Sequence, residues 1–276
     1  MNLTRLVFTQ KTIMFNSVPK CGSRTLVWVF WDFVRQFQTP EPVYVEYMLD
    51  IPNYEKKKVT LREKVIQQER PAFIHGHYRY LELPEYERPV FASMIRDPYA
   101  RYISWYYFMR HGDADMNKTA LLKQLGPRAA RANETLDDCF ANKRHDCRDP
   151  FYYELNIRLF CGYDPKCDTD QKYALKRAKE NLEKYLVIGL MEEYEDTVKV
   201  MEKLMPSMFG GAVQTYRDML AQSAEHSKTF YKKYPSKKTE DYLKDKLKYD
   251  LEFYEYVKER FHKLKNKLGI GSTSEC

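Results

Sequence analysis

A change of hydrophobic periodicity near residue 26 constrains the fold of this chain more than any other feature. The segment 11–16 is a short apolar run of strand-forming residues, and it leads into a polar turn at 17–25 that contains a glycine. Beyond the turn, apolar side chains recur at helical spacing until Pro40: Leu26, Val29, Phe30, Phe33 and Phe37. We therefore expect a strand, a loop and a helix, the unit from which parallel α/β sheets are built.

The rest of the chain continues this alternation. We expect strands at 72–75, 90–95 and 186–190, and helices at 61–69, from Pro98 onward, and at 194–204. Pro98 suits a first helical turn, because the N–H that proline lacks would have no partner there. These elements predict one domain over residues 1–276, with a parallel sheet covered on both faces and sites at the carboxyl ends of its strands.

Two further stretches complete the expected organisation. The polar segment 112–149 contains two cysteines, and we expect a surface excursion there rather than core. A last helix is predicted because apolar residues alternate steps of three and four: Leu243, Leu247, Leu251, Tyr254, Val257, Phe261, Leu264 and Leu268.

The overall composition indicates a globular protein that binds polyanions. Its 276 residues, 43% of them apolar, are enough for a well-buried core. The net charge of +7 is compatible with nucleic acid, anionic lipid, nucleotide phosphates or a sulfated sugar as partner. Lysines in the final third are also expected if that part is simply a solvated helix face.

The six cysteines indicate an oxidising compartment. Cys139 and Cys147, and Cys161 and Cys167, suggest two short closed loops, whereas Cys21 and Cys276 stand alone. Zinc is the rival interpretation, but no pair has the usual zinc spacing and no histidine pair completes a site.

Three sequons agree with a secretory route: Asn2-Leu-Thr4, Asn117-Lys-Thr119 and Asn133-Glu-Thr135. No stretch approaches 18 consecutive apolar residues and no signal-peptide pattern opens the chain. If the protein is secretory, we expect its anchor or signal in a longer precursor.

The turn after the first strand has the composition of a phosphate-binding loop. Amides at a helix start are unpaired and the helix dipole favours an anion there. Gly22 permits close backbone approach, Ser23 and Thr25 add hydroxyls, and Lys20 and Arg24 add charge. The Walker pattern Gly-x-x-x-x-Gly-Lys is absent, which disfavours a nucleotide kinase. A helix that is merely capped remains the alternative.

A second candidate follows the strand at 90–95. Arg96 would stand at the sheet edge, where a guanidinium can donate two hydrogen bonds to a phosphate. Ser104 lies about two helical turns further on. A local ion pair between Arg96 and Asp97 is the alternative.

These two segments resemble the 5′-phosphosulfate loop and the 3′-phosphate motif of sulfotransferases. The resemblance is to the uronosyl 2-O-sulfotransferases, Golgi enzymes that act on glycosaminoglycans, and it extends over nearly the whole chain. Its further segments are 73–77, 106–113, 160–162, 187–193 and 252–262. The sequences of residues 20–25 and of the last helix look closer to the dermatan/chondroitin uronyl branch and the insect Pipe proteins than to the heparan branch.

The resemblance implies a P-loop-like fold with a long C-terminal helix, and 3′-phosphoadenosine 5′-phosphosulfate (PAPS) as donor. His77 matches the catalytic base and His75 its companion at the substrate, while Lys20 would contact the sulfate and the bridging oxygen. The remaining nucleotide contacts implied by the resemblance are Cys21, Gly22, Ser23, Arg24, Thr25, Arg96, Ser104, Tyr216, Thr229 and Lys232. No metal is chemically necessary if cations and amides stabilise the leaving group.

The resemblance also implies a partner and a location. The acceptor would be an acidic polysaccharide rather than nucleic acid, the protein would lie in the Golgi lumen as a type II membrane protein with its anchor outside this chain, and the last helix would form a homotrimer. The two cysteine pairs match the disulfides of the family in spacing.

One residue departs from the family pattern. Where the heparan branch has an acceptor-site arginine, this chain has Ser17, which puts heparan recognition in doubt. A heparan-specific enzyme and a non-catalytic glycan-binding relative are the alternatives. Cys21 is interpreted as a spacer whose amide binds the ligand, rather than as a reactive thiol.

Overall fold

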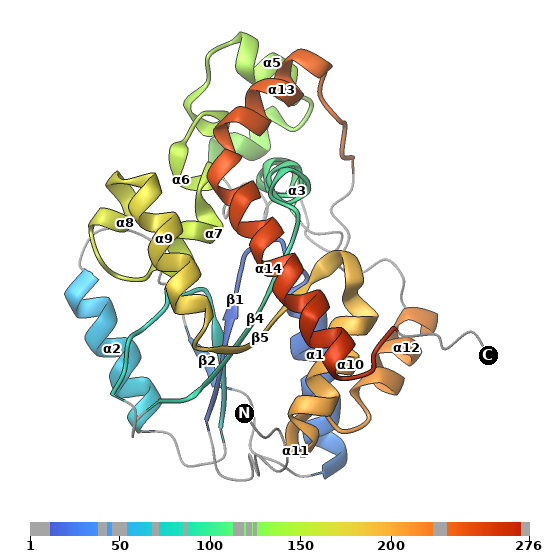
Figure 1. Cartoon of the computed structure of the whole chain (residues 1–276). Helices are drawn as coiled ribbons and strands as arrows, with labels where there is room; N and C mark the ends of the chain where they lie inside the picture. Colours follow the sequence, from blue (N-terminus) through green and yellow to red (C-terminus); the bar gives the residue numbers. More distant parts are fainter. Residues whose placement is uncertain are drawn as a thin grey trace.

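A parallel five-stranded sheet in the order β2-β3-β1-β4-β5 forms the centre of the molecule (Figure 1). The strands are β1 (Ile13–Ser17), β2 (Val43–Val45), β3 (Phe73–Gly76), β4 (Val90–Ile95) and β5 (Tyr185–Leu190). This computed structural model describes residues 12–37, 43–45, 54–67, 72–84, 88–112, 119, 123, 126–222 and 231–271. Every residue of β1 is buried, as expected for a central strand covered on both faces. The predicted fold class is confirmed, and the single domain over 1–276 stays a prediction.

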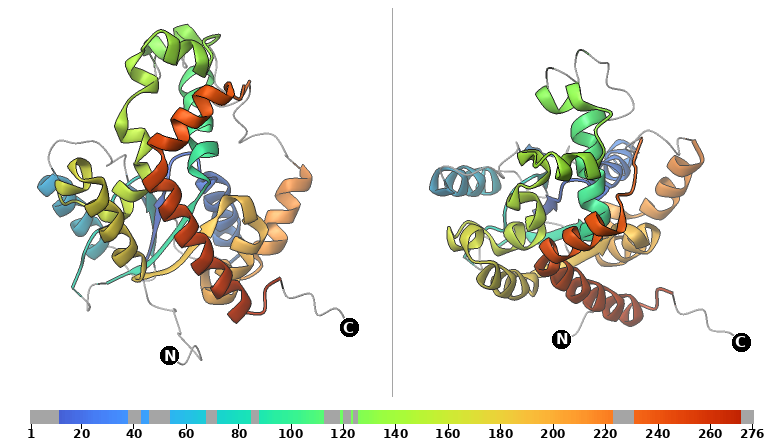
Figure 2. Two further views of the ribbon diagram at one scale, coloured as in Figure 1. Left: turned by 45° about the horizontal axis from the view of Figure 1, so that its top comes forward. Right: turned by 90° about the horizontal axis from the view of Figure 1, so that it is seen from above.

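Helices cover both faces of the sheet. Their bounds are α1 (Ser23–Phe37), α2 (Tyr54–Ile66), α3 (Pro98–His111), α5 (Leu136–Ala141), α6 (Pro150–Tyr153), α7 (Leu155–Cys161), α8 (Lys166–Thr169), α9 (Gln171–Leu182), α10 (Tyr194–Leu204), α11 (Pro206–Phe209), α12 (Ala212–Gln222), α13 (Lys237–Lys246) and α14 (Lys248–Lys267), with short 3-10 turns η2 (Gly126–Arg131), η3 (His145–Cys147) and η4 (Met191–Glu193). Seen from above, α1 and α2 lie on one side of the sheet and α9 and α14 on the other (Figure 2). In the described part of the chain, no helix is both long and apolar enough to span a membrane.

Helix α3 begins as the sequence predicts and then runs through the interior. The side chain of Asp97 caps its first turn, because Oδ1 accepts a hydrogen bond from the amide of Ala100 at 2.7 Å. Pro98 occupies the first turn. Most of the helix is buried, including Arg101 and Arg110, so it has no solvent-facing stripe.

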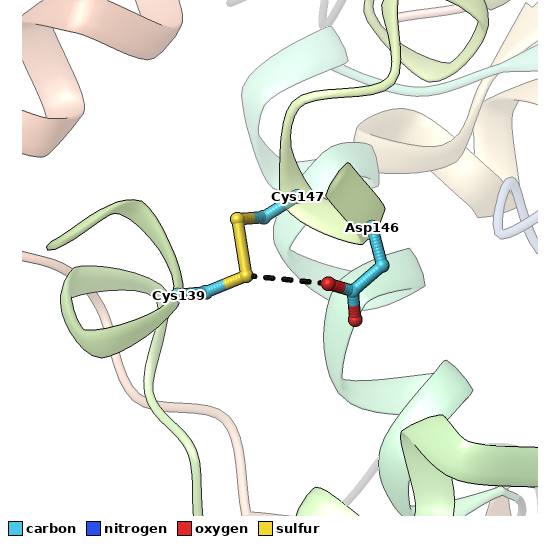
Figure 3. A group of neighbouring side chains, drawn as sticks. All are labelled: Cys139, Asp146 and Cys147. Carbon is cyan, nitrogen blue, oxygen red and sulfur yellow. Dashed lines mark hydrogen bonds between the residues drawn. A yellow bond between two sulfur atoms is a disulfide. The ribbon is translucent and has the colours of Figure 1, made fainter. Parts of the chain in front are cut away.

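The prediction of a surface excursion holds for most of residues 126–149, but it is wrong for the part around the disulfide. Leu136 and the Cys139–Cys147 disulfide are buried and pack with Tyr102 and Tyr106 of α3 into a second apolar cluster. The disulfide itself is drawn in Figure 3. The polar sequence does not indicate this buried part, because Glu134 and Asp146 are nearly buried and pair with arginines, which offsets the cost of burying them.

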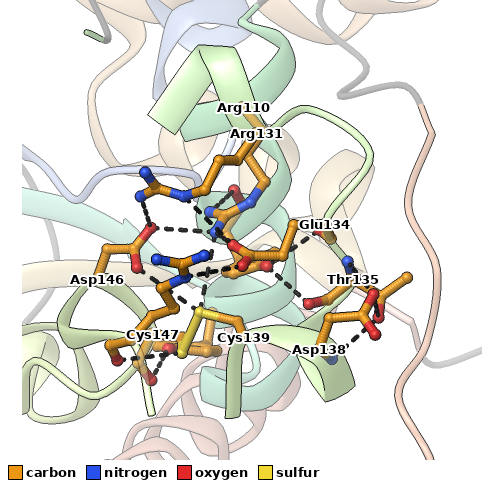
Figure 4. Close-up of polar contacts among 11 residues, drawn as sticks. Arg110, Arg131, Glu134, Thr135, Asp138, Cys139, Asp146 and Cys147 are labelled. Atoms are coloured by element: carbon orange, nitrogen blue, oxygen red, sulfur yellow. Dashed lines mark hydrogen bonds and ion pairs between the residues drawn. A yellow bond between two sulfur atoms is a disulfide. The ribbon is translucent and has the colours of Figure 1, made fainter. Parts of the chain in front are cut away.

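The buried guanidinium of Arg110 is the centre of this charge network. It donates to Glu134 Oε2 at 2.7 Å and to Asp146 Oδ2 at 3.0 Å, and Arg131 adds a bond to Asp146 at 3.2 Å (Figure 4). Although burial alone would raise the pKa of Asp146, the two arginines hold it below its usual value. Asp146 therefore remains ionised, and the network joins residues 126–149 to the end of α3.

The predicted last helix is divided in two at Leu247. Its two parts cover different cores: Leu243 and Leu247 pack into the second cluster, whereas Phe253, Val257 and Phe261 pack against the sheet. The apolar spacing continues through Leu247 without interruption, so it does not indicate the break. The long C-terminal helix is α14, which crosses the front of the molecule in Figure 1.

Candidate active site

Three segments with anion- or proton-binding chemistry meet at the carboxyl edge of the sheet. Strand β1 lies between β3 and β4, with Asn16 opposite Gly76 and Ser17 opposite Met94. Since parallel strands end at one edge, the turn after β1, His77 after β3 and Arg96 after β4 are neighbours. We call residues 20–25 the first cradle, and Arg96 together with Ser104 the second cradle.

The first cradle is a tight turn with two residues in the left-handed region. Lys20 has φ of 67° and Gly22 has φ of 77°, and the amide of Cys21 donates to the carbonyl of Val18 at 3.3 Å. A lysine with positive φ is uncommon, and such strain concentrates at functional turns. Helix α1 begins directly afterwards at Ser23, so the amides of the turn and the helix start face the same edge.

The ammonium of Lys20 lies against helix α3. Its Nζ is 4.1 Å from the centre of the Phe108 ring, a cation–π contact that holds the charge beside the element that follows Arg96. Phe108 is a residue that sequence reasoning missed, and no pattern marks it, since it lies on a helix that is buried nearly all round.

Cys21 is buried inside the first cradle. Burial raises the pKa of its thiol to about 12, against the opposing influence of the nearby Arg101 and Arg96. A thiol with so high a pKa is protonated and a poor nucleophile, in agreement with the spacer interpretation. Arg96 is close enough to Cys21 to affect the pKa of its thiol, so the two cradles are adjacent.

The second cradle belongs to β4 and α3. Arg96 is half-buried at the end of the strand, and Ser104 is buried two helical turns further along α3. The carboxylate of Asp97 has another role than an ion pair with Arg96, because it caps α3. The amide of Asp97 donates to Glu192 Oε1 at 3.0 Å.

The two histidines lie close enough together that His77 affects the pKa of His75. The strand ends at Gly76, so the chain has turned before His77 and the alternation of a strand no longer separates the rings. Burial, together with His77, lowers the pKa of His75 to about 4. Burial also lowers the pKa of His77, with a smaller contribution from the Arg24 cation, whereas its hydrogen bond to Ser17 acts in the opposite direction. Both rings are therefore neutral near pH 7.

The residues expected to close over the nucleotide are found in two places. Tyr216 of α12 is buried, and its ring stacks on that of Tyr194 with centres 4.7 Å apart. Lys232 lies near Arg96: burial and then this like charge lower the pKa of its ammonium. Two cations held together in this way favour a bound anion. Thr229 lies outside the described residues.

Residues with the chemistry of metal ligands gather in one group of the described chain, at Cys139, Asp146 and Cys147. Both sulfurs of this group are joined in the disulfide, so they are not available to an ion (Figure 3). The second predicted pair, Cys161 and Cys167, also forms a disulfide.

Fold and site together define an α/β protein in which two cationic turns and a neutral histidine lie at the carboxyl edge of a parallel sheet. The chain belongs to the sulfotransferase family, whose model, described as "Sulfotransferase family", matches residues 4–257.

Curated relatives narrow the resemblance within that family. The chain is 30% identical to mouse uronyl 2-sulfotransferase over 94% of its length, and spans 64% of the length of that relative. It is 32% identical to heparan sulfate 2-O-sulfotransferase 1 of Xenopus laevis over 90% of its length and 70% of the relative's. A solved structure of mouse sulfotransferase SULT7A1 complexed with PAP has a TM-score of 0.37 and 16% identity over 76% of this chain and 64% of that chain.

Proposed function

We propose that this chain transfers a sulfuryl group from PAPS to the 2-hydroxyl of a uronic acid in a glycosaminoglycan. The observation that carries the proposal is the meeting of two cationic cradles and His77 at the ends of three adjacent strands. Relatives named uronyl 2-sulfotransferase and heparan sulfate 2-O-sulfotransferase support the acceptor class.

Each cradle takes one end of the donor. The amides and hydroxyls of residues 21–25 hold the 5′-phosphate, and Lys20 reaches the sulfate and the oxygen that bridges it to the phosphate. Arg96 and Ser104 hold the 3′-phosphate. Tyr216, Thr229 and Lys232 close over the nucleotide. With cations on both phosphates, charge that develops on the departing nucleotide is stabilised without a metal ion.

His77 acts as the general base. The acceptor hydroxyl attacks the sulfur in line with the bridging oxygen, the new O–S bond forms as the bond to that oxygen breaks, and Nε2 of His77 takes the hydroxyl proton. The products are the sulfated sugar and adenosine 3′,5′-bisphosphate. The lowered pKa of His77 supports this role, because the ring remains neutral to a lower pH than an ordinary imidazole does. His75 would contact the acceptor beside it.

The acceptor is proposed to be of the dermatan or chondroitin type. Ser17 stands where the heparan branch has an acceptor-site arginine, so one cation for a heavily sulfated chain is missing. The net charge of +7 supports binding of an acidic polysaccharide in general.

The test is transfer of labelled sulfate from PAPS to three separate acceptors: dermatan, chondroitin and N-sulfated heparosan. We expect label in the first two, and disaccharide analysis should find it on the 2-position of the uronic acid. Label on heparosan alone would favour the heparan-specific alternative. Binding of adenosine 3′,5′-bisphosphate without any transfer would favour the non-catalytic relative.

We also propose a Golgi-lumen location, glycosylation and a homotrimeric assembly through the last helix. The two disulfides suit an oxidising compartment, and Asn133 is an exposed sequon asparagine; Asn2 and Asn117 lie outside the described residues. Glycosidase digestion of protein from a secretory host and light scattering after size-exclusion chromatography test the last two points. A mass of one chain at micromolar concentration would contradict the trimer.

A further inference from the structure

The short connection from β5 to α10 contacts the first cradle and also Asp97, the residue after Arg96 of the second cradle. It contains η4 and the first residue of α10, with the sequence Met191-Glu-Glu-Tyr194. Glu192 and Tyr194 are two positions apart, and Tyr194 contacts the first cradle while Glu192 contacts the residue next to Arg96. The proposed function gives neither of them a role.

Tyr194 holds the first cradle. Its hydroxyl donates to the carbonyl of Gly22 at 3.1 Å, and its ring lies so close that a Cβ on Gly22 would be 3.0 Å from Cε2. Burial, with Tyr216 beside it, raises the pKa of this phenol well above its usual value, so the hydroxyl remains a donor. Stacking on Tyr216 fixes the plane of the ring.

Glu192 holds the turn of the second cradle. Its Oε1 accepts from the amide of Asp97, the residue after Arg96, at 3.0 Å. Its other oxygen accepts from the hydroxyl of Tyr254 on α14 at 3.1 Å, which fixes the carboxylate. The amide of Asp97 precedes α3 and would otherwise have no helical partner.

A bisphosphate nucleotide makes the separation of the cradles important. Its two phosphates lie at a distance set by the ribose, so the best affinity requires both cradles to stand at the matching separation before the ligand arrives. The cradles belong to different strands and different loops, whereas Glu192 and Tyr194 belong to one short segment. Contacts from one segment to both turns fix one turn relative to the other.

We propose that Glu192 and Tyr194 are positioning residues that set the separation of the two cradles. This inference rests on the proposed binding of a 3′,5′-bisphosphate nucleotide. The two side chains then control how tightly the donor binds, although they need not touch it.

The experiment measures binding of three probes, adenosine 3′,5′-bisphosphate, adenosine 5′-phosphate and adenosine 3′-phosphate, by calorimetry. Tyr194→Phe retains the ring and loses the hydroxyl that bonds Gly22 and Thr25 of the first cradle, so we expect adenosine 5′-phosphate to bind about threefold to tenfold more weakly, with the affinity for adenosine 3′-phosphate unchanged. Glu192→Ala should show the opposite selectivity. Both variants should weaken the bisphosphate. In Glu192→Gln the amide oxygen can still accept from Asp97, so binding should be at least as tight as in the wild type.

Matched controls are available nearby. Tyr173→Phe on α9 removes a hydroxyl that bonds Asp164 at 2.7 Å. Glu193→Gln alters the carboxylate next to Glu192 in the sequence, which bonds His262 and Lys265. Both controls should bind all three probes as the wild type does.

The outcomes separate the two levels of the proposal. If the wild type binds the bisphosphate, and Tyr194→Phe and Glu192→Ala bind it equally well, the positioning role alone is overturned. A loss that is the same for both monophosphates indicates general destabilisation and also overturns it. If the wild type does not bind the bisphosphate, the proposed function fails and the inference fails with it.

Discussion

Ring nitrogen Nδ1 of His77 donates a hydrogen bond to the backbone carbonyl of Ser17, the last residue of β1. A carbonyl oxygen can only accept, so Nδ1 carries the proton and the lone pair of the neutral ring is on Nε2. The bond also joins the end of β1 to the turn after β3. The backbone carbonyl of Ser17 therefore selects the tautomer that a general base requires. Ser17 is also the residue at which β1 ends, just before the first cradle.

Replacing His77 by alanine should separate chemistry from binding. Loss of a general base costs about 10²-fold to 10⁴-fold in turnover, whereas both phosphate cradles remain. Turnover is measured as labelled sulfate transfer, and affinity as calorimetric titration with adenosine 3′,5′-bisphosphate. The exposed His145, which lies in η3, offers a control in His145→Ala. Wild-type turnover in His77→Ala would exclude the ring as base.

The pH profile of transfer should have an acid limb below 6.5. Burial lowers the pKa of His77 from its ordinary value, so the neutral, active form persists as the pH falls and is lost only when the pH reaches the lowered value. The measurement is kcat/KM for the acceptor between pH 4.5 and 8. A limb centred above 6.5 would mean that another group controls the rate.

Asp137 should affect donor binding from a distance. Its carboxylate accepts from the amide and hydroxyl of Ser236, at 2.8 and 2.7 Å, and from Thr239 at 2.5 Å, at the start of α13. Ser236 follows Lys232 by four residues, so this contact anchors the segment that closes over the nucleotide. For Asp137→Ala we expect about 1–3 kcal/mol less stability and a severalfold weaker affinity for adenosine 3′,5′-bisphosphate.

Urea denaturation and calorimetry measure these two effects of Asp137→Ala. Asp164→Ala is the control, since that carboxylate likewise bonds an amide and a hydroxyl, of Lys166 and Tyr173, away from the cradles. Equal affinity in Asp137→Ala and wild type would show that the anchor does not reach Lys232.

Sequence reasoning succeeded where the signal is local. The strand, turn and helix around the first cradle follow from residues 11–37 alone, and β4 occupies the predicted residues 90–95. The contact of Tyr194 with Gly22 joins positions 172 residues apart, and no periodicity in either segment indicates it. Likewise, Glu134 and Asp146 looked like surface residues because one of their partners, Arg110, belongs to α3. Neither periodicity nor composition shows which residue, distant in the sequence, a given side chain will contact.

Gly22→Ala should disrupt the first cradle, and a second glycine allows the cause to be isolated. Gly22 has φ of 77° and its added Cβ would meet the Tyr194 ring, whereas Gly211 has φ of 82° with nothing within 4 Å of its added Cβ. Backbone strain in the left-handed region costs about 1–2 kcal/mol in either variant. Only Gly22→Ala must also displace the ring or the loop, so we expect at least tenfold weaker binding of adenosine 3′,5′-bisphosphate in Gly22→Ala and wild-type binding in Gly211→Ala. Comparable affinities in the two variants would mean that the close approach of Tyr194 does not shape the phosphate loop.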